Sequence, residues 1–166
     1  MPSMKILLIA GGWSSEREVS LTGARGMQEA LLKRGHAVTF FDLLENFDEL
    51  LETARQHDFA LINLHGSPGE DGLVQAMLEK ADCPYQGSGP SGSFLALNKA
   101  AAKQIFRMAG LPTADWEFLP VRPAEGWEPR LPWPLFVKTT TGGSSLRLGR
   151  ATNRQELDAL MDEIFA

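Results

Sequence analysis

The sequence contains a single cysteine, no long apolar run and no excess of basic side chains. Because Cys83 has no second cysteine to pair with, an internal disulfide is excluded, and the lone thiol favours a reducing cytoplasm. No run approaches the roughly 20 apolar residues that a membrane span needs, and the first residues lack the cleavage pattern of a signal peptide. With 21 acidic and 16 basic residues, the net charge is −5. We therefore expect no nucleic-acid partner and no membrane partner.

Two nucleotide-binding fingerprints are also missing. The dinucleotide pattern G-x-G-x-x-G fails after Gly12, where Trp, Ser, Ser and Glu follow. The Walker pattern G-x-x-x-x-G-K-[ST] fails around Lys138. These failures exclude a dinucleotide-binding domain and a P-loop.

The residues that are present suit a globular chain, since 43% are hydrophobic and 22% are charged. Short apolar runs alternate with apolar residues at helical spacing. Strands are expected at 5–10, 37–41, 59–64 and 83–85, and helices at 21–31, 47–54 and 73–78. Asn46 and Glu49 have the spacing of a capping box that would begin the second helix. This alternation predicts an α/β fold with a parallel sheet and helices on both of its faces.

The pattern changes after Gly89. One helix is expected at 95–109, a strand at 135–138, a loop of small residues at 139–145 and a last helix at 153–164. Six of the ten prolines lie within Pro112–Pro134, which excludes a helix interior there. Asn153 and Glu156 have capping-box spacing at the start of the last helix.

Glu16 lies in the loop that follows the first predicted strand. In open α/β sheets, ligands bind at the carboxyl ends of strands, where glycines such as Gly11 and Gly12 let a ligand approach the backbone. A carboxylate there would repel a pyrophosphate and suits a cationic group, such as a substrate ammonium. The structural alternative is a plain turn in which Ser15 caps the next helix.

The loop 65–72 follows the third predicted strand and carries three groups that bind metals in other proteins, His65, Glu70 and Asp71. Turn and helix-dipole chemistry explain a Pro-Gly turn with acids at the start of the next helix. We therefore assign Glu70 and Asp71 a structural role. His65 stays open between a ligand-binding role and a hydrogen-bonded strand end.

Lys138 ends a predicted strand and precedes the Gly- and Thr-rich loop 139–145. Backbone N–H groups and an ammonium can together hold a nucleotide phosphate, and the structural alternative is a β-hairpin tip. Lys99 and Lys103 lie one helical turn apart and by themselves indicate a solvated helix face.

Five short motifs, taken in order, have a family resemblance. They are Gly11–Leu21 (GGWSSEREVSL), Leu64–Gly72 (LHGSPGEDG), Pro84–Gly89 (PYQGSG), Asn98–Lys99, and Lys138 with Gly143–Ser145. Together they resemble the D-alanine–D-alanine ligases, which are ATP-grasp ligases. The resemblance implies a Rossmann-like pre-ATP-grasp domain at residues 1–98. It implies that residues 99–166 begin an α+β ATP-grasp lobe.

What the resemblance implies about activity is ATP-dependent synthesis of D-alanyl-D-alanine for the peptidoglycan of the cell wall. Glu16 matches the glutamate that holds the ammonium of the first D-alanine, and Ser144 matches the serine that supports it. These two are the expected catalytic residues. His65 matches a histidine that lines the same substrate pocket.

The resemblance also implies an ATP site. Lys99 and Lys138 match the lysines that contact the ATP phosphates. Gly143, Ser144 and Ser145 match the loop that closes over the γ-phosphate, where backbone N–H groups stabilise developing charge.

The sequence departs from the family pattern at two places. Thr139 stands where the family usually has proline, and Leu146 and Arg147 stand where it usually has Val-Gly. Because arginine cannot adopt the backbone torsions of glycine freely, the closure of this loop is an open question.

Family enzymes are roughly twice the length of this chain. The half that is absent carries the Mg²⁺ ligands, an oxyanion-site arginine and the adenine pocket. We therefore expect no metal ligands in these 166 residues and no ligase activity from them alone. A homodimer through the N-terminal domain is expected, because family ligases are commonly dimers.

Two other functions stay open at this point. An ATP-grasp ligase that joins other amino or hydroxy acids would have the same first half, because the specificity for the second substrate is set mainly in the absent half. A non-catalytic binding module derived from a ligase fits the length of the chain and Arg147. The joint presence of the two pocket residues and the two lysines weighs against such a module.

Overall fold

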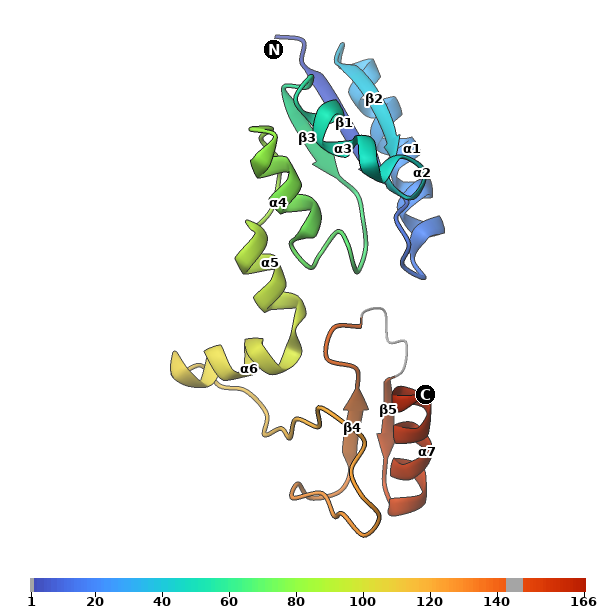
Figure 1. Cartoon of the computed structure of the whole chain (residues 1–166), viewed down its shortest axis with the longest axis vertical. Helices are drawn as coiled ribbons and strands as arrows, with labels where there is room; N and C mark the ends of the chain where they lie inside the picture. The colour runs from blue at the N-terminus through green and yellow to red at the C-terminus, as the bar shows by residue number, and fades with distance from the viewer. Residues whose placement is uncertain (1, 143–147) are drawn as a thin grey trace. The chain divides into compact units, whose positions relative to one another are not determined.

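The computed structural model describes residues 2–142 and 148–166. Its contacts divide the chain into two compact units, Met1–Leu95 and Ala96–Ala166 (Figure 1). The first unit is α/β and the second is α+β, which confirms the predicted fold class. The assignment of 1–98 and 99–166 to the two domains of an ATP-grasp ligase stays a prediction.

A three-stranded parallel sheet forms the centre of the first unit. Its strands are β1 (Lys5–Ala10), β2 (Ala37–Asp42) and β3 (Phe59–Ile62), in the order β2-β1-β3. The expected fourth strand is reduced to a single parallel bridge between Tyr85 and Ala60. The carboxyl ends of β1 and β3 are therefore neighbours at one edge of the sheet.

Strand β1 is buried on both faces, as its unbroken apolar sequence predicts. Leu7 and Ile9 join the larger core cluster, which includes residues of the helices α3 (Leu50–Ala54) and α4 (Leu73–Lys80). Leu8 and Ala10 instead pack with Ala24 of the helix α1 (Arg17–Lys33). Helices thus cover both faces of the sheet.

The segment after β2 differs from its prediction. It forms α2 (Leu43–Asn46), the 3-10 turn η1 (Phe47–Glu49) and then α3. The predicted capping box at Asn46 is wrong, because the Asn46 amide donates to the Asp42 carbonyl at 3.1 Å. Asp42 is the cap instead, and its Oδ1 accepts from Leu44 N at 3.1 Å.

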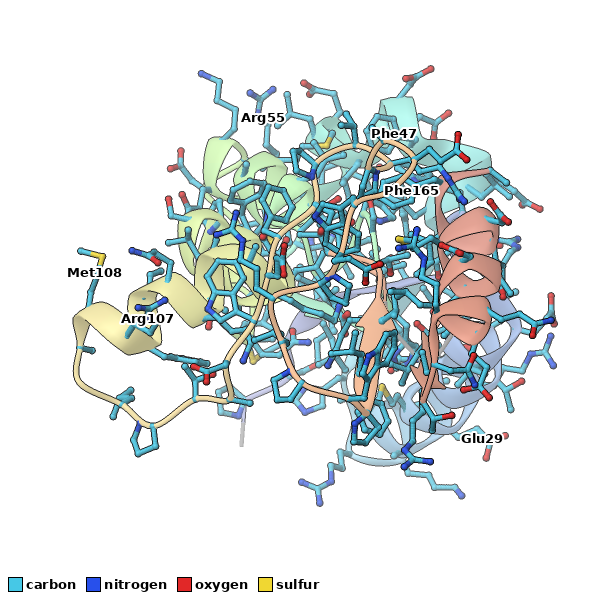
Figure 2. The ribbon with its side chains drawn as sticks, turned by 90° about the horizontal axis from the view of Figure 1, so that it is seen from below. Glu29, Phe47, Arg55, Arg107, Met108 and Phe165 are labelled. Carbon is cyan, nitrogen blue, oxygen red and sulfur yellow. The ribbon has the colours of Figure 1, made fainter. Side chains whose placement is uncertain are left out.

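The single helix expected at 95–109 is also wrong, because the structure has two helices there. They are α5 (Pro90–Leu97) and α6 (Lys99–Met108). Asn98 between them is extended, with φ −77° and ψ 99°, and its Oδ1 accepts from Ala101 N at 3.0 Å. Met108, which is 79% exposed, and Arg107 project from the end of α6 (Figure 2).

An antiparallel hairpin and one helix form the compact part of the second unit. The predicted strand is β4 (Leu135–Lys138), and it pairs with β5 (Leu148–Ala151), which the sequence analysis missed. The helix α7 (Arg154–Phe165) packs on the hairpin through a cluster that includes Ala151, Leu157 and Met161. Residues 112–134 hold no helix, as the prolines predict, but the edge strands expected in this stretch are absent as well. Within the described residues, no helix is both long enough and apolar enough to cross a bilayer.

The predicted cap of α7 is present, and it provides a test of the second unit. Asn153 Oδ1 accepts from Glu156 N at 3.0 Å, and the Glu156 carboxylate accepts from Thr152 N at 2.7 Å. We expect Asn153→Ala to lower the free energy of unfolding of this unit by about 1 kcal/mol, because an orphaned helix N–H loses its acceptor. Urea denaturation followed by circular dichroism measures this loss. Asn153→Asp keeps the acceptor and is the control; equal losses in both variants would contradict the capping role.

Candidate functional site

The loop after β1 depends on glycine. Gly11 has φ +78°, and a Cβ atom on it would lie 2.5 Å from Arg17 Nη1 and 2.6 Å from Asp42 Oδ1. Both the left-handed backbone and the close approach of these side chains exclude a larger residue. Gly12 follows with φ +75°. The chain therefore turns sharply at the carboxyl end of β1 and carries Glu16 to the start of α1.

A bidentate ion pair holds this turn. Arg17 Nη1 and Nη2 donate to the two carboxylate oxygens of Asp42 at 2.7 Å and 2.6 Å. Arg17 Nη1 also donates to the Gly12 carbonyl at 3.3 Å. The hydrogen bonds from Arg17 hold the pKa of the Asp42 carboxyl below its ordinary value of 3.8. The pair thus connects β2, α1 and the glycine turn.

Glu16 lies against the loop that carries His65. A Cβ atom on Gly66 would lie 3.8 Å from Glu16 Oε2 and 3.4 Å from Ser14 Cβ, so the two loops are in close contact. Gly66 has φ +66°, which favours glycine there. Glu16 and His65 are both partly exposed. A carboxylate next to a loop that carries a histidine, at the carboxyl edge of a parallel sheet, can bind a small cationic substrate.

The proposed helix cap at Ser15 is wrong. Glu16 occupies the cap position of α1 and makes no capping hydrogen bond through its side chain. Ser14 Oγ instead accepts from Glu16 N at 3.2 Å. The serines thus shape the turn, and Glu16 stands at its end.

Glu70 and Asp71 have the structural roles that turn chemistry predicts. Glu70 Oε2 accepts from Gly66 N at 3.1 Å, which closes the loop on itself. Asp71 Oδ1 accepts from Leu73 N at 3.0 Å at the start of α4. Over residues 2–142 and 148–166, no group of three or more His, Cys, Asp or Glu side chains is placed to hold a metal ion.

In the second unit, Lys99 binds the chain that follows β4. Its backbone N–H donates to Thr140 O at 3.0 Å, and its Nζ donates to the carbonyls of Thr140 and Gly142. Burial, and then the positive charge of Lys138, lower the pKa of Lys99. The solvated-face alternative is therefore wrong for Lys99. It is wrong for Lys103 too, whose Nζ donates to Thr113 Oγ1 at 2.7 Å.

Lys138 ends β4, where the sequence predicts it, and its side chain is exposed. Its neighbours on the strand alternate, since Val137 packs toward α7 and Phe136 is 65% exposed on the other face. The ammonium groups of Lys99 and Lys138 repel each other. Such a pair attracts an anion, because a bound anion relieves the repulsion. The predicted loop residues Gly143, Ser144 and Ser145 lie outside the described residues, as does Arg147.

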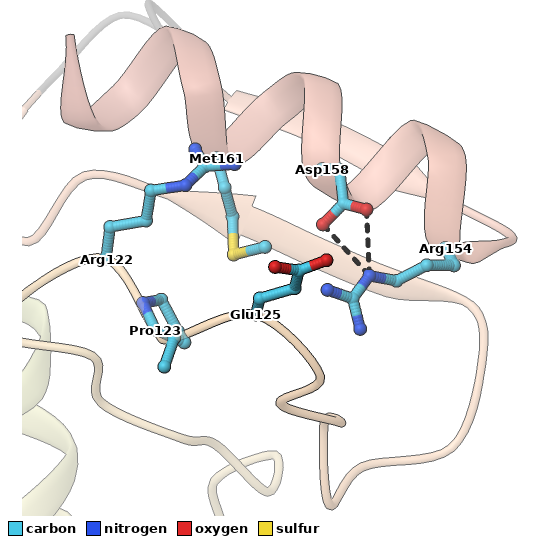
Figure 3. Close-up of a pocket in the computed structure, with 7 residues that line it drawn as sticks. Arg122, Pro123, Glu125, Arg154, Asp158 and Met161 are labelled. Carbon is cyan, nitrogen blue, oxygen red and sulfur yellow. Dashed lines mark hydrogen bonds and ion pairs between the residues drawn. The ribbon is translucent and has the colours of Figure 1, made fainter.

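A surface pocket of about 290 Å³ lies elsewhere in the second unit (Figure 3). It includes Arg122, Glu125, Arg154 and Asp158 in its lining, and none of the predicted site residues. Arg154 Nε donates to both oxygens of Asp158 at 2.9 Å. Arg154 and Asp158 therefore pair with each other, and Arg122 pairs with Asp162 outside the lining.

Comparison with known proteins gives consistent results. No family model matches the chain. A D-alanine–D-alanine ligase of Desulfovibrio desulfuricans is 76% identical over 163 residues, which are 98% of this chain and 53% of that protein. A ligase of the same name from Nitratidesulfovibrio vulgaris is 64% identical, and the match covers 54% of that protein. Over nearly its whole length, this chain is therefore similar to D-alanine–D-alanine ligases. It spans about half the length of the curated relatives that it matches.

Solved ligase structures have the same fold. The D-alanine–D-alanine ligase of Bacillus anthracis, in its ATP complex, is 34% identical with a TM-score of 0.85. The match covers 98% of this chain and 55% of that one. The D-alanyl-alanine synthetase A of Vibrio cholerae is 26% identical with a TM-score of 0.79.

Two parts of this ligase-like site escaped the sequence analysis. The Arg17–Asp42 pair joins residues 25 positions apart, and only the side-by-side register of β1 and β2 brings them together. The carbonyl groups that bind Lys99 are backbone atoms, which leave no signal in a sequence.

The Arg17–Asp42 pair makes stability depend on pH. Because the folded pKa of Asp42 is lowered, its contribution is complete above the unfolded pKa of about 3.9 and is lost as the pH falls through the folded pKa. We expect Asp42→Asn to destabilise the first unit at pH 7, with a difference from the unsubstituted chain that shrinks below about pH 4. Urea denaturation between pH 7 and pH 3 measures this. Asp48→Asn, at an exposed position, is the control; a difference that stays constant to pH 3 would contradict the prediction.

Proposed function

We propose that this chain supplies the first-substrate pocket and part of the ATP site of a D-alanine–D-alanine ligase. The similarity to the D. desulfuricans ligase, at 76% identity over nearly the whole chain, carries this proposal. In the proposed reaction, the carboxylate of one D-alanine attacks the γ-phosphate of ATP, which gives an acyl phosphate and ADP. The amine of a second D-alanine then attacks the acyl carbon, phosphate leaves, and the dipeptide forms for peptidoglycan.

The first unit supports the substrate part of the proposal. Glu16 would hold the ammonium of the first D-alanine, with His65 lining the same pocket. The closeness of the Gly66 position to the Glu16 carboxylate supports this pairing, because a Cβ atom on Gly66 would lie 3.8 Å from Glu16 Oε2 and the two residues therefore stand on adjoining loops. Ser144 would support Glu16 and act with it in catalysis.

The second unit supports the ATP part. Lys99 and Lys138 would contact the phosphates, and Gly143, Ser144 and Ser145 would close over the γ-phosphate with their backbone N–H groups. The electrostatic interaction between the two lysines supports the assignment, since it marks a position that favours a polyanion. An ammonium has three donors, and the carbonyls of Thr140 and Gly142 accept two from Lys99.

The metal ion, the location and the assembly of the protein belong to the same proposal. Mg²⁺ would accompany ATP and be held by residues in the half of the ligase that this chain does not span. The protein would act in the cytoplasm, which its single buried free thiol, Cys83, supports. A homodimer through the N-terminal domain would be its assembly, and size-exclusion chromatography with light scattering tests it.

The activity is tested by joining this chain to the remaining half of the D. desulfuricans ligase. We expect this fusion to release ADP in the presence of D-alanine, ATP and Mg²⁺, and to form D-alanyl-D-alanine. The 166 residues alone should release none. A panel of other amino and hydroxy acids, offered to the same fusion, separates the alternative substrate classes. An inactive fusion that is folded would contradict the proposal.

The ATP assignment predicts a distinct kinetic effect for Lys138→Met. In the fusion, we expect the KM for ATP to rise about tenfold or more, because one charge-assisted contact to phosphate is lost. The KM for D-alanine should not change.

Lys103→Met is the matched control on α6, because the Lys103 ammonium binds Thr113 Oγ1. It should leave both KM values unchanged. Equal increases in the KM for ATP in the two variants would show that Lys138 has no specific role there.

A further inference from the structure

Ser20 and Asn63 form a reciprocal bridge between α1 and the end of β3. Ser20 Oγ donates to the Asn63 carbonyl, and Asn63 Nδ2 donates to the Ser20 carbonyl at 2.7 Å. Ser20 Oγ also accepts from Gly11 N at 2.8 Å. Each side chain thus binds the backbone of the other residue, and the first glycine of the turn joins the same network.

The Ser20 side chain is fully buried. Burial of a hydroxyl is unfavourable unless its hydrogen bonds are made, and an apolar residue usually fills such a position at lower cost. Here both the donor and an acceptor site of the hydroxyl are used. A buried serine with this arrangement specifies geometry rather than adding apolar packing.

The two residues of the bridge are close in the chain to the two proposed substrate residues. Ser20 is one helical turn after Glu16, and Ser20 N donates to Glu16 O at 3.0 Å in the first turn of α1. Asn63 is two residues before His65, and Asn63 N donates to Ile9 O at 2.8 Å. The segments that carry Glu16 and His65 are therefore both held at the end of β1. The first is held through Gly11, and the second through Ile9.

We propose that Ser20 and Asn63 are positioning residues that set the distance between Glu16 and His65. This inference rests on the proposed function, since it assigns the pair to the pocket for the first D-alanine. Neither residue needs to touch the substrate. Their effect on the reaction passes through the two loops that they hold together.

Gly23 of α1 allows the bridge to be disturbed without removing it, and Gly26 on the same helix provides the control. A Cβ atom on Gly23 would lie 3.0 Å from Asn63 Nδ2, so an alanine there displaces the amide by a few tenths of an ångström. A Cβ atom on Gly26 would meet nothing within 4 Å. Alanine raises helix propensity at both positions, so the two substitutions differ only in their effect on Asn63.

The test measures steady-state kinetics of the full-length fusion described above. We expect Ser20→Ala to raise the KM for the first D-alanine about tenfold or more, because small misplacements of binding groups have large effects. Gly23→Ala should raise it about threefold, and Gly26→Ala should leave it unchanged. The KM for ATP should stay constant in all three. Thermal unfolding identifies any variant that fails to fold. If Ser20→Ala does not fold, Gly23→Ala still tests the positioning role.

The outcomes separate the inference from the function on which it rests. If the unsubstituted fusion does not turn over, the proposed function fails and the inference fails with it. If it turns over but Gly23→Ala and Gly26→Ala have equal KM values for D-alanine, the positioning role alone is refuted. Parallel increases in the KM for ATP would likewise refute it, since a general loss of structure would then explain the result.

Discussion

The bidentate ion pair between Arg17 and Asp42 is the contact on which the position of the Glu16 loop depends. It forms across the carboxyl ends of β1 and β2, and the glycine turn passes directly against it. Without a side chain at Gly11, the turn can approach both charged groups closely. The pair and the turn together determine where α1 begins, and Glu16 stands at that point.

Hydrogen bonds from side chains to backbone complete this arrangement. The Ser20–Asn63 bridge ties α1 to β3 from the buried side, while the ion pair ties it to β2 from the more exposed side. The loops that carry Glu16 and His65 therefore project from a sheet edge that is held on two sides. Such bracing suits a binding site, because groups that are held in place before binding lose little freedom when the ligand arrives.

The second unit uses a different device, a partly buried ammonium. Lys99 begins α6 and binds two carbonyls of the chain after β4, so one residue joins the helix to the hairpin. Burial and the nearby positive charge of Lys138 both lower the pKa of Lys99. Part of the stability of this site is thus given up, and the concentrated positive charge favours a bound anion.

Much of this could be predicted from residue patterns, and particular failures show why the rest could not. Apolar continuity correctly predicted β1, and small and acidic residues correctly predicted turns at 65–72. The capping box at Asn46 failed because Asp42, already held by Arg17, offers a better acceptor to the helix start. The strand β5 was missed because Leu148–Ala151 is short and contains glycine, and its pairing with β4 supplies the stability that its own sequence lacks.

By itself, the sequence determined the kind of fold, the positions of the turns and the residue types able to bind an ammonium and a phosphate, because these follow from periodicity, glycine and charge. It also carried the motifs that resemble the ligases. Only the tertiary structure decided which of those residues meet. The approach of Glu16 to Gly66, the Ser20–Asn63 bridge and the carbonyl cradle of Lys99 all join segments distant in the chain, since strand register and helix packing bring them together.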